Sequence, residues 1–350
     1  MTSATTLAPV TPPVRSRDPF LDNARYWVML LVVVGHFLTH LQDVPGVRVA
    51  YTWLYLFHMP VFILISGYTA RRHTGDARQV RRMVSTLVVP YLLVETLLEV
   101  TEAVLAGEPV RLHVLEPEWL TWFIAALFIW RLTTPIWLAV RWPVAVAVAV
   151  SLLGGLVPVG DVLGLPQVIG FLPFYVAGLY LTKDHFDRLV QPAVRAGAVV
   201  ALVVAFVVCA VWSDGWTISW LYFRDGYSEA PLSAGPLEGL AIRALLLVVG
   251  LVLAVSALAL VPQRRAWFSS TGERTLYPYL LHGFVVLVLV YSGAFDALAD
   301  RGLAGVAVAV VAAAALAHVL MTRTVARLFR PFFEPSLTWL FKRDAQRIER

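Results

Sequence analysis

Long apolar stretches recur along the whole chain and are separated by short polar segments. The hydrocarbon core of a bilayer is about 30 Å thick, and a helix of about 20 predominantly apolar residues crosses it. The pattern therefore predicts an all-α, polytopic membrane protein with about ten transmembrane helices. Their expected ranges are 26–42, 50–69, 83–105, 119–139, 143–159, 167–182, 194–212, 240–261, 275–294 and 303–321.

The composition agrees with this class. Of the 350 residues, 59% are hydrophobic and only 15% are charged, which is unlike a soluble domain. The single cysteine, Cys209, excludes an internal disulfide and a cysteine-based metal site, and we expect no metal. We expect a multi-pass protein of the cell membrane, whose partners include the lipid bilayer.

The two ends of the chain differ from its middle. Residues 1–17 are rich in Pro, Thr and Ser and are expected to be a disordered tail. Residues 18–325 form the expected transmembrane domain. Residues 326–350 are basic with interspersed aromatics, which is typical of an amphipathic segment lying on anionic lipid.

The basic residues predict the orientation of the spans. Cytoplasmic loops carry an excess of Lys and Arg, and a cytoplasmic N-terminus gives that excess in every inner loop. The net charge of +5 then reflects this bias, so no nucleic-acid partner is implied. Both termini are expected in the cytoplasm. All but five of the 28 Lys and Arg residues fall on the inner side; the five are Arg48, Arg111, Arg224, Arg243 and Arg301.

Arg25 and His36 share one face of the first expected span. The eleven helical steps from Arg25 to His36 make about three turns, which puts the side chains about 16 Å apart along the axis. Arg25 would lie at the cytoplasmic surface and His36 near the middle of the bilayer. Ionisable residues at membrane depth are expensive and are functional candidates by default.

Three further ionisable residues lie inside expected spans: His58, Glu95 and His282. Each has a structural alternative to a role in chemistry. A buried histidine is often neutral and bonded to a backbone carbonyl, and a buried glutamate is often protonated or hydrogen-bonded. The functional interpretation makes His282 and Glu95 part of a catalytic group, with Glu95 orienting a histidine, and makes His58 a substrate contact.

Between the second and third expected spans, arginine is denser than topology alone requires. One interpretation is the inner-side bias plus lipid headgroup contact. The other, which includes Arg25, is a cytoplasmic phosphate site, because arginine binds phosphate bidentately and stays charged. The chain lacks a P-loop and a glycine-rich dinucleotide fingerprint, so side chains would hold the phosphates. The arginines are Arg71, Arg72, Arg78, Arg81 and Arg82.

These residues together suggest acyl-coenzyme A. Its phosphates suit arginines at the cytoplasmic mouth, and its slender pantetheine arm could reach His36. Histidine is the usual general base for a hydroxyl, and it can also carry an acyl group transiently. The combination predicts transfer of an acyl group to a hydroxyl acceptor.

The chain also resembles a known family. The segments LDNARYWVMLLVVVGHF, LFHMPVFILISGY followed by arginines, EWLTWFIAALFIWRL, FLPFYVAGLYL and TLYPYLLHGF, with Pro90–Tyr91 between the second and third of these, occur in this order. They resemble the integral-membrane acyltransferase 3 family, and particularly its fucose 4-O-acetylase-like branch. The resemblance implies a cytoplasmic acyl-CoA donor, usually acetyl-CoA, and O-acylation of a carbohydrate or glycosylated acceptor.

The resemblance also implies roles for single residues. Arg25 and His36 match the family's essential arginine–histidine pair, and Arg78 and Arg81 fall where the family carries further functional arginines. Independently of the resemblance, Ser66 is a candidate substrate contact and a candidate donor to the developing oxyanion. In the long outer loop, Trp216 and Trp220 would stack on a sugar or form part of an interfacial aromatic belt.

Two functions of other classes compete with acyl transfer. A transporter or flippase of a glycan or lipid is compatible with ten helices and intramembrane ionisable residues, although the sequence lacks paired interrupted helices in matching halves. A membrane scaffold leaves His36 and the cytoplasmic arginines unexplained.

Overall fold

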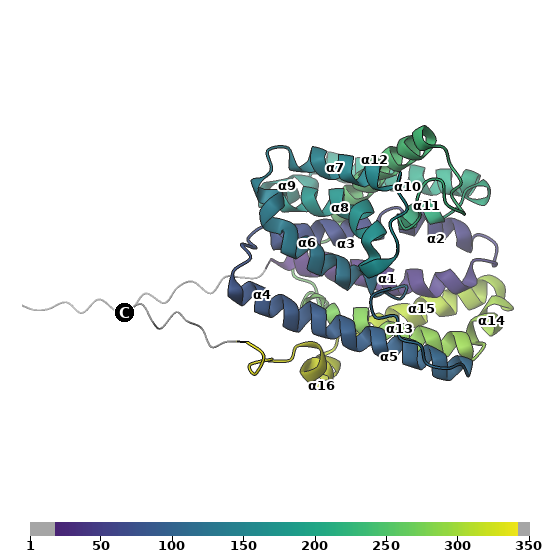
Figure 1. The fold of residues 1–350 in the computed structure, drawn as a ribbon. Helices are drawn as coiled ribbons and strands as arrows, with labels where there is room; N and C mark the ends of the chain where they lie inside the picture. The colour runs from purple at the N-terminus through teal and green to yellow at the C-terminus, as the bar shows by residue number, and fades with distance from the viewer. Residues whose placement is uncertain (1–17, 342–350) are drawn as a thin grey trace, which may run out of the picture.

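The computed structural model describes residues 18–341, and all the regular secondary structure in that range is helical (Figure 1). The tail expected over 1–17 and the end of the tail expected over 326–350 lie outside the described residues. The α-helices are α1 (Pro19–Leu38), α2 (Val47–Tyr55), α3 (His58–Ala70), α4 (Ala77–Met83), α5 (Val89–Ala106), α6 (Trp122–Ala139), α7 (Pro143–Gly154), α8 (Leu165–Leu179), α9 (Lys183–Leu189), α10 (Pro192–Trp212), α11 (Ser219–Tyr222), α12 (Pro236–Leu260), α13 (Leu276–Tyr291), α14 (Ala294–Ala299), α15 (Gly302–Leu320) and α16 (Arg323–Phe333).

Within residues 18–341, eight helical segments are long and apolar enough to cross a membrane. Two shorter apolar helices, α7 and α13, coincide with the fifth and ninth expected spans. The prediction of an all-α, multi-pass membrane protein is therefore confirmed. The total of about ten spans and the side on which the termini lie stay predictions.

Helix α1 lies in the middle of the bundle (Figure 1). It packs against α3 on one side and against α13 and α15 on the other. Helix α3 in turn packs on α8, and α8 packs on α7. Residues from the first and last thirds of the chain therefore meet around α1, which brings polar groups from distant segments together.

The second expected span, 50–69, is interrupted where α2 gives way to α3. Pro60 explains the break, because a proline has no N–H to donate to the carbonyl four residues back and its ring collides with that carbonyl. The chain turns at Leu56 and Phe57, and α3 begins at His58. This start places the His58 ring beside the end of α2, where Nδ1 donates to the Leu54 carbonyl over 3.0 Å.

The third expected span is longer than predicted and contains one wide turn. Residues Ala77–Ala106 form a continuous helix in which Val84–Val88 adopt π geometry between α4 and α5. The wide turn directly precedes Pro90, which cannot complete the regular bonding pattern. The Tyr91 hydroxyl donates to the carbonyl of Val114 over 2.7 Å, which fastens the loop between α5 and α6 to this helix.

The contact between α3 and α8 depends on two glycines. A Cβ atom at Gly67 would lie 2.1 Å from the carbonyl oxygen of Tyr175, and one at Gly178 would lie 2.3 Å from that of Leu64. Small residues let membrane helices approach closely enough for extensive van der Waals contact. The two glycines therefore set the distance between the helices that carry Ser66 and Tyr175.

We expect Gly67→Ala and Gly178→Ala to destabilise the protein by about 1–3 kcal/mol each, because overpacking a tight contact forces the backbones apart. The measurement is the temperature at which half of the detergent-purified protein loses its monodisperse chromatographic peak. Gly197→Ala in α10 is the matched control, because a Cβ atom at this position would have no neighbour within 4 Å. Equal melting of all three variants would contradict the role of the two glycines.

Candidate active site

Two histidines from helices far apart in the sequence meet in the middle of the bundle. His36 on α1 and His282 on α13 are joined by a hydrogen bond of 2.6 Å between Nδ1 of His36 and Nε2 of His282. Their rings are nearly parallel, with an interplanar angle of 10° and centroids 4.9 Å apart. His282 is fully buried, whereas His36 is half-buried.

The Pro278 carbonyl determines which nitrogens of His282 and His36 donate and which accept. Nδ1 of His282 lies 2.6 Å from the carbonyl oxygen of Pro278, which can only accept. With both rings neutral, Nδ1 of His282 carries the proton and its Nε2 accepts from Nδ1 of His36. Nε2 of His36 is then left with a lone pair. The pair thus forms a proton-ordered chain with its basic end at His36.

Trp119 packs against the His36 ring, edge to face, with centroids 4.6 Å apart. The loop that carries Trp119 is held by Glu95 on α5. The Glu95 carboxylate accepts from the backbone N–H of Glu118 over 2.8 Å and from the hydroxyl of Thr121. Glu95, predicted to orient a histidine, therefore orients the tryptophan that contacts His36.

His36 lines a cavity of about 440 Å³ at the C-terminal end of α1, which we call the aromatic cavity. Histidines, tyrosines and tryptophans form much of its wall, with carboxylates and one arginine among them. His58, a predicted substrate contact, belongs to this wall. The aromatic and ionisable lining residues are His36, His40, Tyr51, Tyr55, His58, Glu102, Glu118, Trp119, Trp122, Asp161, Phe171, Tyr222, Arg224 and Tyr291.

Polar side chains in the aromatic cavity are held by one another. The hydroxyls of Tyr51 and Tyr222 lie 2.7 Å apart, and Nη2 of Arg224 donates to Asp161 over 2.7 Å. Burial raises the pKa of Tyr222, so this phenol keeps its proton. The hydrogen bond to Asp161 raises the pKa of Arg224. The cavity thus offers fixed hydroxyls and charges to a polar ligand.

The two tryptophans predicted to touch a sugar lie outside this lining. The carbonyl of Trp216 accepts from Nη2 of Arg48 over 2.8 Å, and Trp220 is buried in the packed interior of the outer loop. The same loop instead contributes Tyr222 and Arg224 to the aromatic cavity.

A second cavity, of about 720 Å³, lies toward the N-terminal end of α1, and we call it the arginine cavity. It contains three of the predicted phosphate ligands, Arg25, Arg72 and Arg82, and also Ser66. Arg25 forms an ion pair with Asp22, at 3.2 Å. The other polar lining residues are Thr69, His73, Gln79, Thr86, Arg131, Glu273, Thr275, Tyr277, Tyr279 and Glu334.

The remaining arginines of the predicted cluster lie outside this lining. Nη1 of Arg71 donates to the carbonyl of Tyr68 over 2.6 Å, and its guanidinium stacks 3.7 Å from the centre of the same ring. Arg78 is exposed on α4. The guanidinium of Arg81 lies 5.8 Å from the Phe341 ring centre. Of the arginines on α4, only Arg82 therefore lines the arginine cavity.

A series of aromatic rings runs from the arginine cavity to the histidine pair. Phe62, Phe123 and Tyr279 line the arginine cavity, with Phe62 stacked on Phe123 at 4.9 Å and Phe123 5.7 Å from Tyr279. The Tyr279 ring lies 6.5 Å from that of His282, and the His282 ring stacks on that of His36. We call Phe62, Phe123 and Tyr279 the aromatic wall.

A family model described as an acyltransferase domain, that of the acyltransferase 3 family, matches residues 18–322. The chain belongs to this family. Membership implies an acyltransferase, and the match runs from the residue that caps α1 to the one before α16. Neither a curated protein nor a solved structure matches the chain. The fucose 4-O-acetylase-like branch stays a prediction.

Sequence reasoning missed several residues of the two cavities. One of them is Arg131, which sequence reasoning treated only as a charge on the inner side. Its position within the expected span 119–139 could have marked it as a functional candidate. Trp119 lies at the start of the same span. Its place against His36 depends on the fold of a loop, for which the sequence carries no signal.

We expect Glu95→Ala to loosen the loop that carries Trp119. The change removes the acceptor of two hydrogen bonds, each contributing about 0.5–1.5 kcal/mol net, so amide exchange over residues 113–121 should quicken by about tenfold. Hydrogen–deuterium exchange with mass spectrometry measures this. Glu108→Ala, an exposed position just after α5, is the control. Unchanged exchange in Glu95→Ala would show that these bonds do not hold the loop.

Proposed function

We propose that the protein is a membrane-embedded O-acyltransferase. It moves an acyl group, with acetyl as the first candidate, from acyl-CoA to a hydroxyl of a carbohydrate or glycosylated acceptor. Acyl-CoA is held in the arginine cavity, and the acceptor is held in the aromatic cavity. The observation that carries the proposal is the chain from Pro278 through His282 to His36, which leaves Nε2 of His36 as a base beside the aromatic cavity.

The reaction follows from that base. Nε2 of His36 takes the proton of the acceptor hydroxyl, and the hydroxyl oxygen attacks the thioester carbon. The new C–O bond forms, the C–S bond breaks, and the coenzyme A thiolate takes the proton back from His36. His282 holds the other nitrogen of His36 and stabilises the imidazolium that exists between the two proton transfers. Acyl-His36 is the alternative intermediate, because histidine can also act as a nucleophile.

The arginine cavity supports the donor end. Arg25, Arg72, Arg82 and Arg131 converge on one hollow, and guanidinium groups suit the pyrophosphate and 3′-phosphate of coenzyme A. The bias of basic residues toward this side supports its being cytoplasmic, where acyl-CoA is made available. The thioester must then pass the aromatic wall to reach His36.

The aromatic cavity supports the acceptor end. Flat aromatic faces such as Trp122 and Phe171 suit the apolar face of a sugar ring, and Glu118, Asp161 and the tyrosines suit its hydroxyls. Burial, followed by the charges of Glu102 and Glu99, raises the pKa of Glu118. The proposal thus assigns donor and acceptor to separate cavities with His36 at their meeting point.

Transport of a glycan or lipid is the second candidate, and it is favoured by the presence of cavities toward both ends of α1. It gives no task to a hydrogen-bonded histidine pair. Uptake into proteoliposomes without turnover of acyl-CoA would favour transport over transfer.

We expect His36→Ala to lower the transfer of radiolabelled acetyl, from acetyl-CoA to native acceptor in membrane extracts, by about 100-fold or more, as loss of a positioned general base does. His282→Phe preserves a flat ring but not the acceptor nitrogen, and should lower transfer by about tenfold. Binding of coenzyme A should not change in either variant. His185→Ala, an exposed position on α9, is the control. Transfer by His36→Ala at the parent rate would exclude the mechanism.

We expect Arg82→Ala and Arg131→Ala each to weaken coenzyme A binding by about 10–100-fold, because each removes charge-assisted hydrogen bonds of about 1.5–3 kcal/mol. Arg78→Ala is the matched control, one turn away on α4 and outside the cavity lining. Equilibrium binding of coenzyme A to detergent-purified protein measures the effect. If Arg78→Ala weakened binding as much as Arg82→Ala, general surface charge rather than the cavity would account for it.

A further inference from the structure

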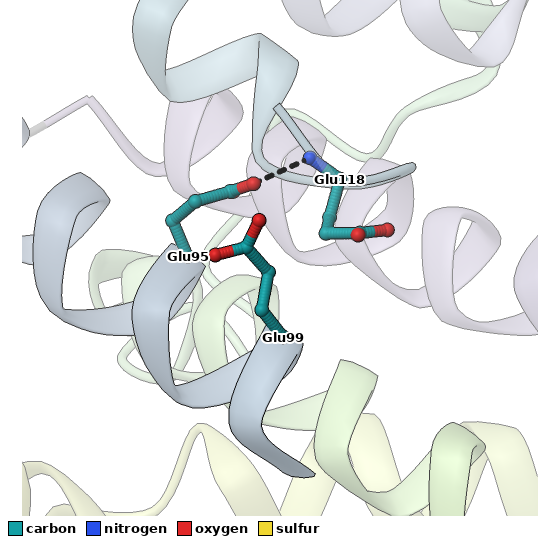
Figure 2. Close-up of side chains that lie close together, drawn as sticks. All are labelled: Glu95, Glu99 and Glu118. Atoms are coloured by element: carbon teal, nitrogen blue, oxygen red, sulfur yellow. Dashed lines mark hydrogen bonds between the residues drawn. The ribbon is translucent and has the colours of Figure 1, made fainter. Parts of the chain in front are cut away.

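Three glutamates meet where α5 faces the loop before α6 (Figure 2). Glu95 and Glu99 lie one turn apart on the same face of α5, and Glu118 comes from the loop. Each offers one carboxylate oxygen, and these three oxygens all lie within 4.8 Å of one another. Like charges this close in a poorly hydrated place repel strongly, and either a bound cation or protonation relieves the repulsion.

Glu99 points to a missing ligand. Its side chain is only 5% exposed, and Oε2 is buried without a hydrogen-bond partner. Its other oxygen, Oε1, accepts from the backbone N–H of His113 over 2.6 Å and lies 3.6 Å from that histidine's Nδ1. Figure 2 shows the Glu99 carboxylate turned toward that of Glu95, so this buried carboxylate belongs to the cluster.

The hydrogen bonds around the cluster do not neutralise it. Glu95 accepts from the Glu118 N–H and the Thr121 hydroxyl, which are neutral donors. Among residues 18–341, no lysine or arginine forms an ion pair with any of the three glutamates. His113 lies 3.6 Å from Glu99, and Arg224 acts on the charge of Glu118 without direct contact. An unsatisfied carboxylate oxygen and an excess of negative charge are what a bound cation would correct.

We propose that Glu95, Glu99 and Glu118 bind a calcium ion. Hard divalent cations prefer carboxylate oxygens, and Ca²⁺ places them about 2.3–2.6 Å away, so oxygens on opposite sides of the ion lie about 4.6–5.2 Å apart. Three carboxylate oxygens within 4.8 Å of one another can share one such ion, and Ca²⁺ accepts a flexible set of about six to eight oxygens, whereas Mg²⁺ demands near-ideal octahedral geometry. Because Glu118 also lines the aromatic cavity, water can supply the remaining ligands.

The bound ion has a defined task. It joins α5 to the loop that carries Trp119, and Trp119 lies against His36. Glu95, Glu99 and Glu118 are therefore positioning residues, and the ion holds one wall of the aromatic cavity in place. This site departs from the expectation of no metal, which rested on the lack of cysteine ligands. Binding of the ion does not depend on the proposed reaction.

The test is calcium binding by the full chain, purified in detergent and freed of metal by a chelator. Isothermal titration with CaCl₂ should show one saturable site in the parent protein. Glu99→Gln keeps the shape but removes a charged ligand and should weaken binding by at least tenfold, as should Glu118→Gln. Glu108→Gln, an exposed glutamate beyond the end of α5, should bind like the parent.

Terbium, which replaces calcium and is excited through nearby tryptophan, gives a readout that locates the ion. Trp119→Phe should lower the sensitised emission while leaving the calcium affinity unchanged, since Trp119 neighbours Glu118 but supplies no ligand. Calcium should also raise the melting temperature of the parent and not that of Glu99→Gln, provided both variants are monodisperse.

Absence of saturable calcium binding up to millimolar concentration would overturn the proposal, as would equal affinity in the parent and Glu99→Gln. The titration, the terbium emission and the melting temperature are all measured without acyl-CoA or acceptor. Failure of the calcium site is therefore distinguishable from failure of the acyl-transfer mechanism.

Discussion

The hydrocarbon core contains no water, so every polar group inside this bundle needs a partner from the protein itself. The side-chain amide of Asn23 on α1 donates to the carbonyls of Pro262 and Arg264 and accepts from Ser269, which binds the segment between α12 and α13 to α1. Arg243 on α12 donates to the carbonyls of Ser151 and Asp225 in the same way. Apolar packing alone does not distinguish between similar arrangements of apolar helices. These polar contacts favour the observed arrangement.

The histidine pair also finds its hydrogen-bond partners within the protein, and in the proposed mechanism these partners determine which ring reacts. His282 satisfies one nitrogen with a carbonyl of its own helix and the other with His36, so nothing on its ring remains open. His36 shares one nitrogen and faces the aromatic cavity with its ring. In the proposed mechanism His282 is therefore structural and His36 reactive, and this difference comes from the position of the Pro278 carbonyl oxygen.

The sequence predicted the helical class and the position of nearly every span, because hydrophobic periodicity is a local property of the chain. It also singled out His36 by its depth, and the structure places this histidine beside a cavity. It did not predict that His36 and His282 touch, since 246 residues separate them and nothing local encodes a contact between α1 and α13. Which arginines of α4 face the arginine cavity depends on the rotation of this helix about its axis. A cluster of arginines in the sequence does not determine that rotation. Glu95 stands out in the sequence as unusual, but its partners belong to a loop whose path only the packed structure defines.

The aromatic wall has a consequence for the membrane as a whole. Two hollows that approach each other from opposite ends of α1 would, if they joined, form a continuous column of water through the bilayer. Moving one elementary charge across a membrane at 100 mV releases about 2.3 kcal/mol, so such a column would drain the proton and ion gradients that the cell maintains. The proposed reaction therefore requires Phe62, Phe123 and Tyr279 to let the thioester end of the donor pass while they keep water and ions from forming such a column.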